Sequence, residues 1–148
     1  MNLSYENSFE IQGGNFKKAG DISVQIKKVL QNLGVPRAIL RRVAIAVYES
    51  EINIISYANK GIIHIQVSPE TVSIEAEDEG PGIENIELAM RAGYSTATDK
   101  IREMGFGAGM GIPNIINCSD TFNITSEVNK GTHLTMIIQL TNNQEEKN

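Results

Sequence analysis

The chain has 148 residues, of which 41% are hydrophobic and 21% are charged, and its formal net charge at pH 7 is −5. This length suits a single domain with its own core, and the composition is that of an ordinary globular protein. The acidic balance argues against binding to a nucleic-acid backbone, and the apolar stretches are interrupted by charges well short of a bilayer span. We therefore expect a cytosolic protein with neither a nucleic-acid nor a membrane partner.

The first part of the chain predicts one strand and two helices. Residues 3–12 are expected to form an edge strand, followed by a glycine turn. A helix is predicted over residues 15–33, with Asn15 as its candidate cap and Gly34 closing it. A second, long helix is predicted over residues 36–59, because its proline stands at the start and no glycine interrupts it.

The second half predicts four more strands, because apolar residues alternate with polar ones. The apolar sets are Ile63, Ile65 and Val67; Val72, Ile74 and Ala76; Phe122 and Ile124; and Leu134, Met136, Ile138 and Leu140. Turn residues at 69–70 and 129–131 predict two hairpins, with a short helix between them. This order predicts an α+β fold: a two-layer α/β sandwich whose mixed, mostly antiparallel sheet is covered on one face by helices. We expect one domain over residues 1–141 and a frayed tail over residues 142–148.

The long helix carries the first chemical candidates. Glu49 and Asn53 are four residues apart and therefore project from the same face. An amide oxygen is a hard ligand suited to Mg²⁺, and a carboxylate can take a proton or orient a water. A local hydrogen-bonded pair is the alternative interpretation. Glu51 lies about 200° round the helix from Asn53 and cannot share that site; we expect it to pair with an arginine or to reach solvent.

A second candidate motif is Asp78-x-Gly80-x-Gly82, which follows the strand that ends near Ala76. A carboxylate at a strand exit can accept a hydrogen bond from the amino group of adenine, and the glycines let a flat ring approach the backbone. A simple turn is the alternative. Thr132 is a weaker signal, because threonine is common in strands.

A third feature is a run of alternating glycines at Gly105, Gly107, Gly109 and Gly111, which leads into an apolar helix. Free backbone amides at the start of a helix suit a phosphate. A flexible surface loop is the alternative interpretation.

Three further residues with reactive side chains are expected to be structural. Cys118 is predicted to be a small buried apolar residue, and His64 and His133 are predicted to be ordinary strand residues.

Taken in chain order, these motifs resemble the GHKL ATPase superfamily of gyrase, heat-shock chaperone, histidine-kinase and MutL ATP-binding domains, over residues 35–140. Within it the chain looks most similar to the small bacterial serine/threonine switch kinases that regulate sigma factors, including anti-sigma-factor kinases and the stressosome switch kinase. The segments Asn-Ile-Ile-Ser-Tyr-Ala at 53–58 and Ala-Met-Arg-Ala-Gly-Tyr-Ser-Thr at 89–96 carry that likeness. The resemblance implies a Bergerat-type ATP-binding fold and a protein serine/threonine kinase that uses ATP and Mg²⁺.

The resemblance also implies roles for the candidate residues. Glu49 would be the catalytic base toward a serine or threonine hydroxyl, and Asn53 would hold the Mg²⁺ that bridges the phosphates. Asp78 would bind adenine, with Gly80 and Gly82 shaping the base pocket.

Residues 93–111 would form an ATP lid, mobile without nucleotide, whose four glycines approach the phosphates. Thr132 would assist at the adenine through a water. Lys100 and Arg102 would either reach the γ-phosphate or remain solvated loop charges.

Two positions depart from the family pattern. Several relatives have a lysine or arginine where this chain has Ser56, and the segment 97–104 is longer and more charged than in similar kinases. Both departures lower the expected rate of turnover.

The partner implied by the resemblance is a STAS-domain protein substrate, with a sigma factor or a phosphatase as second partner and with monomer or homodimer left open. A nucleotide-sensing binding module with little catalysis is the main alternative. An ATP-binding domain detached from a two-component kinase is a third.

Overall fold

The computed structural model describes residues 4–91 and 110–140, and these form one sheet with helices on one face. The five strands are β1 (Tyr5–Gln12), β2 (Lys60–Val67), β3 (Thr71–Glu79), β4 (Thr121–Glu127) and β5 (Gly131–Gln139). The helical elements are the 3-10 turn η1 (Phe16–Lys18) and the helices α1 (Asp21–Asn32), α2 (Arg37–Tyr57), α3 (Ile86–Ala89) and α5 (Gly111–Cys118).

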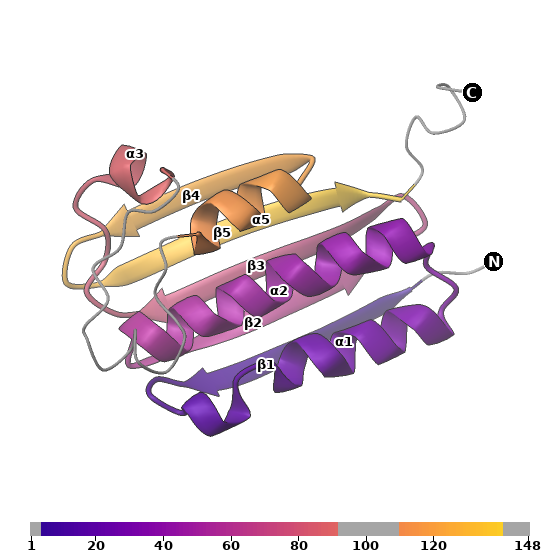
Figure 1. The fold of residues 1–148 in the computed structure, drawn as a ribbon, viewed down its shortest axis with the longest axis horizontal. Coiled ribbons are helices and arrows are strands. Elements are labelled where there is room, and N and C mark those ends of the chain that lie inside the picture. The colour runs from indigo at the N-terminus through magenta and orange to yellow at the C-terminus, as the bar shows by residue number, and fades with distance from the viewer. Residues whose placement is uncertain (1–3, 92–109, 141–148) are drawn as a thin grey trace.

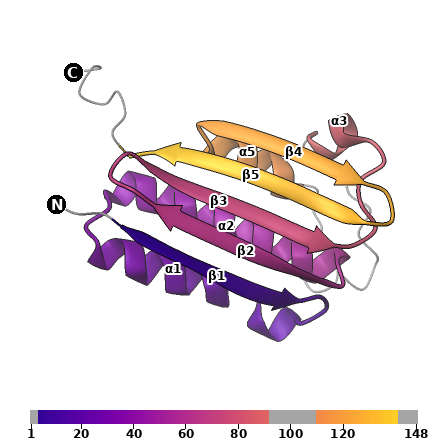
Figure 2. The ribbon, with the colours of Figure 1, turned by 180° about the vertical axis from the view of Figure 1, so that it is seen from behind.

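The sheet has the order β1-β2-β3-β5-β4, and every neighbouring pair is antiparallel. Helices α1, α2 and α5 lie side by side on one face (Figure 1). Seen from behind, the opposite face carries none of the described helices (Figure 2). The predicted two-layer α+β fold is therefore confirmed, including the edge position of β1 and both hairpins.

The core lies between the sheet and the three helices. Alternate residues of the central strands point into it, and the fully buried ones include Ile63, Ile65, Ile74, Met136 and Ile138. Helix α2 packs between α1 and α5 and also contacts the sheet. Burial of this apolar surface is the main term that stabilises the domain. It also fixes which faces of α2 are turned toward α5 and which toward α1.

The predicted first helix begins later than expected. Asn15 precedes only the single turn η1, and its side chain makes no cap hydrogen bond. Gly20 then takes a left-handed conformation with φ of 95°, which interrupts helical geometry, and α1 starts at Asp21. The predicted closure is confirmed, because Gly34 has φ of 87° and follows the last turn of α1.

None of the helices in the described part of the chain is both long and apolar enough to cross a membrane.

Candidate functional site

Glu49 and Asn53 project from α2 toward the first residue of α5. A Cβ atom built on Gly111 would lie 3.0 Å from Asn53 Oδ1 and 3.6 Å from Glu49 Oε1. Glu49 and Asn53 are both partly buried. The structure therefore brings together three predicted site residues, and the missing side chain of Gly111 leaves room where the two polar groups converge.

Glu49 has a second contact that the sequence did not indicate. The side-chain amide of Asn114, in the first turn of α5, donates a hydrogen bond of 2.9 Å to Glu49 Oε2. An asparagine in a short helix gives no signal of such a role by itself. Only the packing of α5 on α2 reveals it.

The other end of α5 is also attached to α2. Arg42 Nε donates to the carbonyl oxygen of Cys118 at 3.0 Å, and the guanidinium forms an ion pair of 3.1 Å with Asp120. A cation at a helix C-terminus satisfies carbonyl groups that have no partner within the helix. Helix α5 is therefore held to α2 at both ends.

Asp78 lies where β3 ends, against the start of β5. Its Oδ1 accepts a hydrogen bond of 3.2 Å from the backbone amide of Thr132. Burial raises the pKa of Asp78, while the hydrogen bond from Thr132 opposes the shift. The two residues that were predicted to act together are thus in direct contact.

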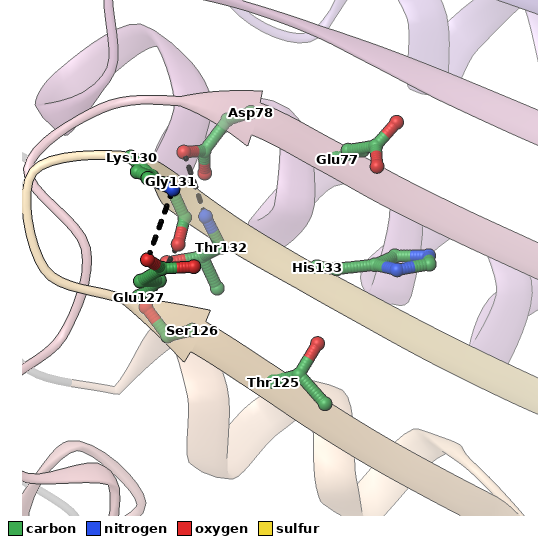
Figure 3. Close-up of a pocket in the computed structure, with 9 residues that line it drawn as sticks. All are labelled: Glu77, Asp78, Thr125, Ser126, Glu127, Lys130, Gly131, Thr132 and His133. Atoms are coloured by element: carbon green, nitrogen blue, oxygen red, sulfur yellow. Dashed lines mark hydrogen bonds and ion pairs between the residues drawn. The ribbon is translucent and has the colours of Figure 1, made fainter.

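Ser126 joins these two residues and was missed by the sequence analysis. Its hydroxyl accepts from the amide of Ile83 at 2.8 Å. It also donates to the carbonyl of Gly131 at 3.0 Å and lies 2.9 Å from Thr132 Oγ1, two residues that Figure 3 draws beside it. A serine hydroxyl has one proton, so when it donates to Gly131 the Thr132 hydroxyl must donate to Ser126. The lone pairs of Thr132 then remain for another donor. The signal that could have found Ser126 is its inward-facing position in β4, two residues after Ile124.

The glycines around Asp78 have a structural reason of their own. Gly82 has φ of 74°, and a Cβ there would overlap the carbonyl of Glu127. A Cβ at Gly131 would overlap the carbonyl of Asp78, and one at Gly80 would lie 3.0 Å from Ala58 Cα. Backbone therefore packs directly on backbone at all three positions, which by itself accounts for glycine there.

A shallow hollow of about 310 Å³ adjoins this end of the sheet. Its lining residues are Glu77, Asp78, Thr125, Ser126, Glu127, Lys130, Gly131, Thr132 and His133. Figure 3 shows Asp78, Thr132 and Ser126 at the strand ends, with Glu77, His133 and Thr125 further along the three strands. The carboxylates suit a ligand that donates hydrogen bonds and do not suit a phosphate.

The position of α2 relates the two groups of residues. The turn after Asp78 reaches Ala58 at the C-terminal end of α2, as the contact from Gly80 shows. At 1.5 Å per residue, Asn53 lies about 7 Å and Glu49 about 13 Å back along the helix axis from Ala58. An acceptor for a base thus lies near the C-terminal end of α2, and a carboxamide and a carboxylate lie further back along the same helix.

The expectation for Glu51 was wrong. Glu51 is only 2% exposed, and its carboxylate forms no ion pair with an arginine in residues 4–91 and 110–140. Its Oε2 accepts from the backbone amides of Gly20 at 3.1 Å and Ile22 at 3.4 Å, while Oε1 has no partner among the described residues. Burial raises the pKa of Glu51, while the hydrogen bonds from these amides act to lower it. The N-terminus of α1 lacks a side-chain cap of its own, so Glu51 supplies the missing acceptor.

The remaining predicted residues fall into two groups. Cys118 is buried, and His64 and His133 are strand residues that contact Glu6 and Glu75 respectively, as expected of structural residues. The predicted lid, with Gly105, Gly107, Gly109, Lys100 and Arg102, lies outside the described residues except at its end, where Gly111 begins α5.

A metal at this site would depend on few protein ligands. No group of three or more His, Cys, Asp or Glu side chains in residues 4–91 and 110–140 is arranged to hold a metal ion. Mg²⁺ commonly takes one or two protein oxygens and completes its shell with phosphates and waters. Asn53 Oδ1 beside Gly111 fits that pattern.

Comparison with known proteins indicates an ATPase-like domain. The family model described as "Histidine kinase-like ATPase domain" matches residues 18–138. The histidine kinase AdeS of Acinetobacter baumannii has a similar fold, with a TM-score of 0.51 and 18% sequence identity over 92% of this chain and 68% of that chain.

Two curated relatives are more similar in sequence. The serine/threonine-protein kinase RsbT of Bacillus subtilis is 32% identical over 115 residues, which cover 75% of this chain and 80% of RsbT. The anti-sigma F factor of Clostridium kluyveri is 32% identical over 138 residues, 89% of this chain and 94% of the relative. The chain therefore belongs to the histidine kinase-like ATPase family, in the branch that contains these serine/threonine kinases and anti-sigma factors.

Proposed function

We propose that this protein uses Mg-ATP to phosphorylate a serine or threonine of a STAS-domain antagonist, and so switches partners in a regulatory pathway. The observation that carries the proposal is the convergence of Glu49 and Asn53 on Gly111 at the start of α5. Kinase and anti-sigma-factor relatives support it. In this proposal the second partner is a sigma factor or a phosphatase, the protein acts in the cytoplasm, and monomer and homodimer are both compatible with it.

The base of the nucleotide would lie beside Asp78, near the C-terminal end of α2. The carboxylate of Asp78 would accept a hydrogen bond from the adenine amino group, and the lone pairs of the Thr132 hydroxyl would accept one from a bridging water. Gly80 and Gly82 would border this pocket. The close approach of Gly80 to Ala58 keeps the turn near α2, and that of Gly82 to Glu127 keeps it near the end of β4.

The phosphates would lie at the start of α5. Backbone amides at a helix N-terminus favour negative charge, and Gly111 carries no side chain that would block them. In the proposal Gly105, Gly107 and Gly109 extend this cradle. Asn53 would hold Mg²⁺, which when bound neutralises phosphate charge and bridges phosphate oxygens.

Glu49 would act as the general base. As the substrate hydroxyl forms a bond to the terminal phosphorus and the bond to ADP breaks, the hydroxyl proton passes to the Glu49 carboxylate. Position along α2 supports this role, because Glu49 lies further than Asn53 from the C-terminal end of the helix, where the Asp78 turn packs.

The test is transfer of labelled phosphate from Mg-ATP to the STAS-domain proteins of the same host. We expect label on one serine or threonine, with transfer lost in Glu49→Ala while ATP affinity is kept. Glu10→Ala removes an exposed carboxylate from β1 and serves as the matched control. ATP binding without transfer to any candidate, with partner switching unchanged in Glu49→Ala, would instead identify a nucleotide-sensing binding module.

A further inference from the structure

We infer that Asn114 is a positioning residue for Glu49, and that its side-chain amide selects which carboxylate oxygen receives the proton. The inference rests on the proposed function, in which Glu49 is the general base. It adds a residue from a different helix to the reaction and connects the start of α5 with proton transfer.

The two oxygens of Glu49 have different surroundings. Oε2 accepts the 2.9 Å hydrogen bond from Asn114 Nδ2. Oε1 faces the N-terminus of α5, 3.6 Å from the Cβ position of Gly111, which is also 3.0 Å from Asn53 Oδ1. A hydrogen bond to Oε2 therefore leaves Oε1 turned toward the side where phosphate and hydroxyl would meet.

The orientation of the Asn114 amide follows from its partner. An ionised carboxylate only accepts hydrogen bonds, so the nitrogen of the carboxamide must face it. Because this donor already occupies Oε2, the proton of the substrate hydroxyl is directed to Oε1. A glutamate has several rotatable bonds, and holding one oxygen keeps the other in the reacting position.

Asn114 itself has a defined place. The neighbouring Ile115 is fully buried, and Arg42 holds the far end of α5 to α2. The amide is therefore presented to Glu49 by a packed helix that is attached at both ends. Because Asn114 is held in this way, its hydrogen bond can fix the orientation of the Glu49 carboxylate.

The first experiment replaces the amide with an apolar group of similar size. We expect Asn114→Leu to lower kcat for phosphotransfer about ten-fold, with the Kd for ATP and the KM for the protein substrate unchanged, because a hydrogen bond to a charged group is lost. Asn117→Leu makes the same chemical change at an exposed position of α5 and is the matched control. Equal loss in both variants, or a native kcat in Asn114→Leu, would overturn the inference.

The second experiment tests whether the donated proton is what matters. In Asn114→Asp two carboxyl groups face each other, and a proton shared between them restores a donor to Glu49 only when the pH is low enough. The activity of Asn114→Asp relative to the native protein should therefore rise as pH falls from 8 to 6, while the relative activity of Asn114→Leu stays constant. A purely structural role for Asn114 predicts no pH-dependent rescue, so a flat ratio for Asn114→Asp would overturn the inference.

Failure of the inference and failure of the proposed function give different results. Basal ATP hydrolysis, with water in place of the hydroxyl, provides the same measurements without a protein substrate. If Glu49→Gln reduces either reaction but Asn114→Leu does not, the proposed function stands and the inference fails. If Glu49→Gln changes neither reaction, both fail. If Asn114→Leu adds no further loss to Glu49→Gln, the two residues act in one step and the inference is supported.

Discussion

Glu51 Oε2 accepts a hydrogen bond of 3.1 Å from the backbone amide of Gly20, and this contact ties the middle of α2 to the start of α1. The carboxylate lies two residues from Glu49 on the same helix but is almost completely buried. One glutamate of α2 thus serves the packing of two helices, while the other faces α5. Their separate roles follow from the helical rotation between them and not from their chemistry.

Glu51→Gln should stabilise the protein at high pH. Burial raises the pKa of Glu51, so the folded chain holds a proton that the unfolded chain releases. The contribution of Glu51 to the free energy of unfolding is therefore fully present below the pKa of the unfolded chain and is lost as pH rises through the folded pKa. Glutamine keeps an acceptor for the amides of Gly20 and Ile22 without this ionisation.

Thermal unfolding of both proteins from pH 4 to 8 measures this effect. The stability of Glu51→Gln relative to the native protein should increase with pH, by about 1.4 kcal/mol for each unit by which the pKa is raised. Comparing the two proteins also cancels the pH dependence that Asp78 contributes. A variant that is less stable than the native protein at pH 8 would show that the charged carboxylate is the better acceptor, and Glu10→Gln supplies the exposed control.

Asp78→Asn should weaken ATP binding and leave the fold intact. Asparagine can still accept from the amide of Thr132 through its Oδ1, but its amino group would meet the adenine amino group, donor against donor. We expect the Kd for ATP to increase roughly 10- to 100-fold, the equivalent of a hydrogen bond to a charged group. Isothermal titration measures it.

The control for this prediction lies away from the hollow. Glu10→Gln makes the same change from carboxylate to carboxamide on an exposed side chain of the edge strand β1. It should bind ATP as the native protein does. If Asp78→Asn and the native protein bind ATP with equal affinity, Asp78 does not bind adenine.

The sequence predicted the sheet well because its strands are amphipathic. Residues such as Ile63 and Ile65 alternate with polar neighbours, and that period has only one interpretation when turn residues flank it. The start of the first helix was misplaced at Asn15, because the left-handed conformation of Gly20 and the acceptor supplied by Glu51 act across distant parts of the chain. Local patterns carry no information about such a contact.

The candidate site was predictable to a similar degree. Spacing on one helix placed Glu49 and Asn53 on a common face, because helical geometry is the same everywhere. Asn114 and Ser126 were missed, because their roles depend on how α5 lies on α2 and how β4 lies beside β5. Contacts between elements that are far apart in the sequence are set by packing, which no single motif encodes.

Gly82→Ala should lower the stability of the domain and disturb the Asp78 turn. Its positive φ is unfavourable for alanine, and the added Cβ would overlap the carbonyl of Glu127 in the β4–β5 hairpin. We expect a loss of about 1–3 kcal/mol in the free energy of unfolding. Gly14 also has a positive φ, but a Cβ built there would meet no atom within 4 Å. The difference between the stability losses of Gly82→Ala and Gly14→Ala therefore measures the effect of the overlap alone. If chemical denaturation shows equal losses of stability for the two variants, the β4–β5 hairpin moves to accommodate the added Cβ at no cost in free energy.

Arg42→Met should loosen the attachment of α5 to α2. Methionine keeps much of the apolar stem but loses the hydrogen bond to the carbonyl of Cys118 and the ion pair with Asp120. Because the pair is partly exposed and solvent screens it, we expect a loss of only about 1 kcal/mol in the free energy of unfolding. Arg41→Met removes an exposed arginine from the same helix and is the control.

A double-mutant cycle with Asp120→Asn separates the ion pair from the hydrogen bond to α5. The loss of stability that Arg42→Met still causes in the Asp120→Asn background is due to the hydrogen bond to the carbonyl of Cys118. If Arg42→Met has no effect on stability in either background, the apolar face of α5 alone holds it to α2. Arg42 would then not contribute to the position of Asn114.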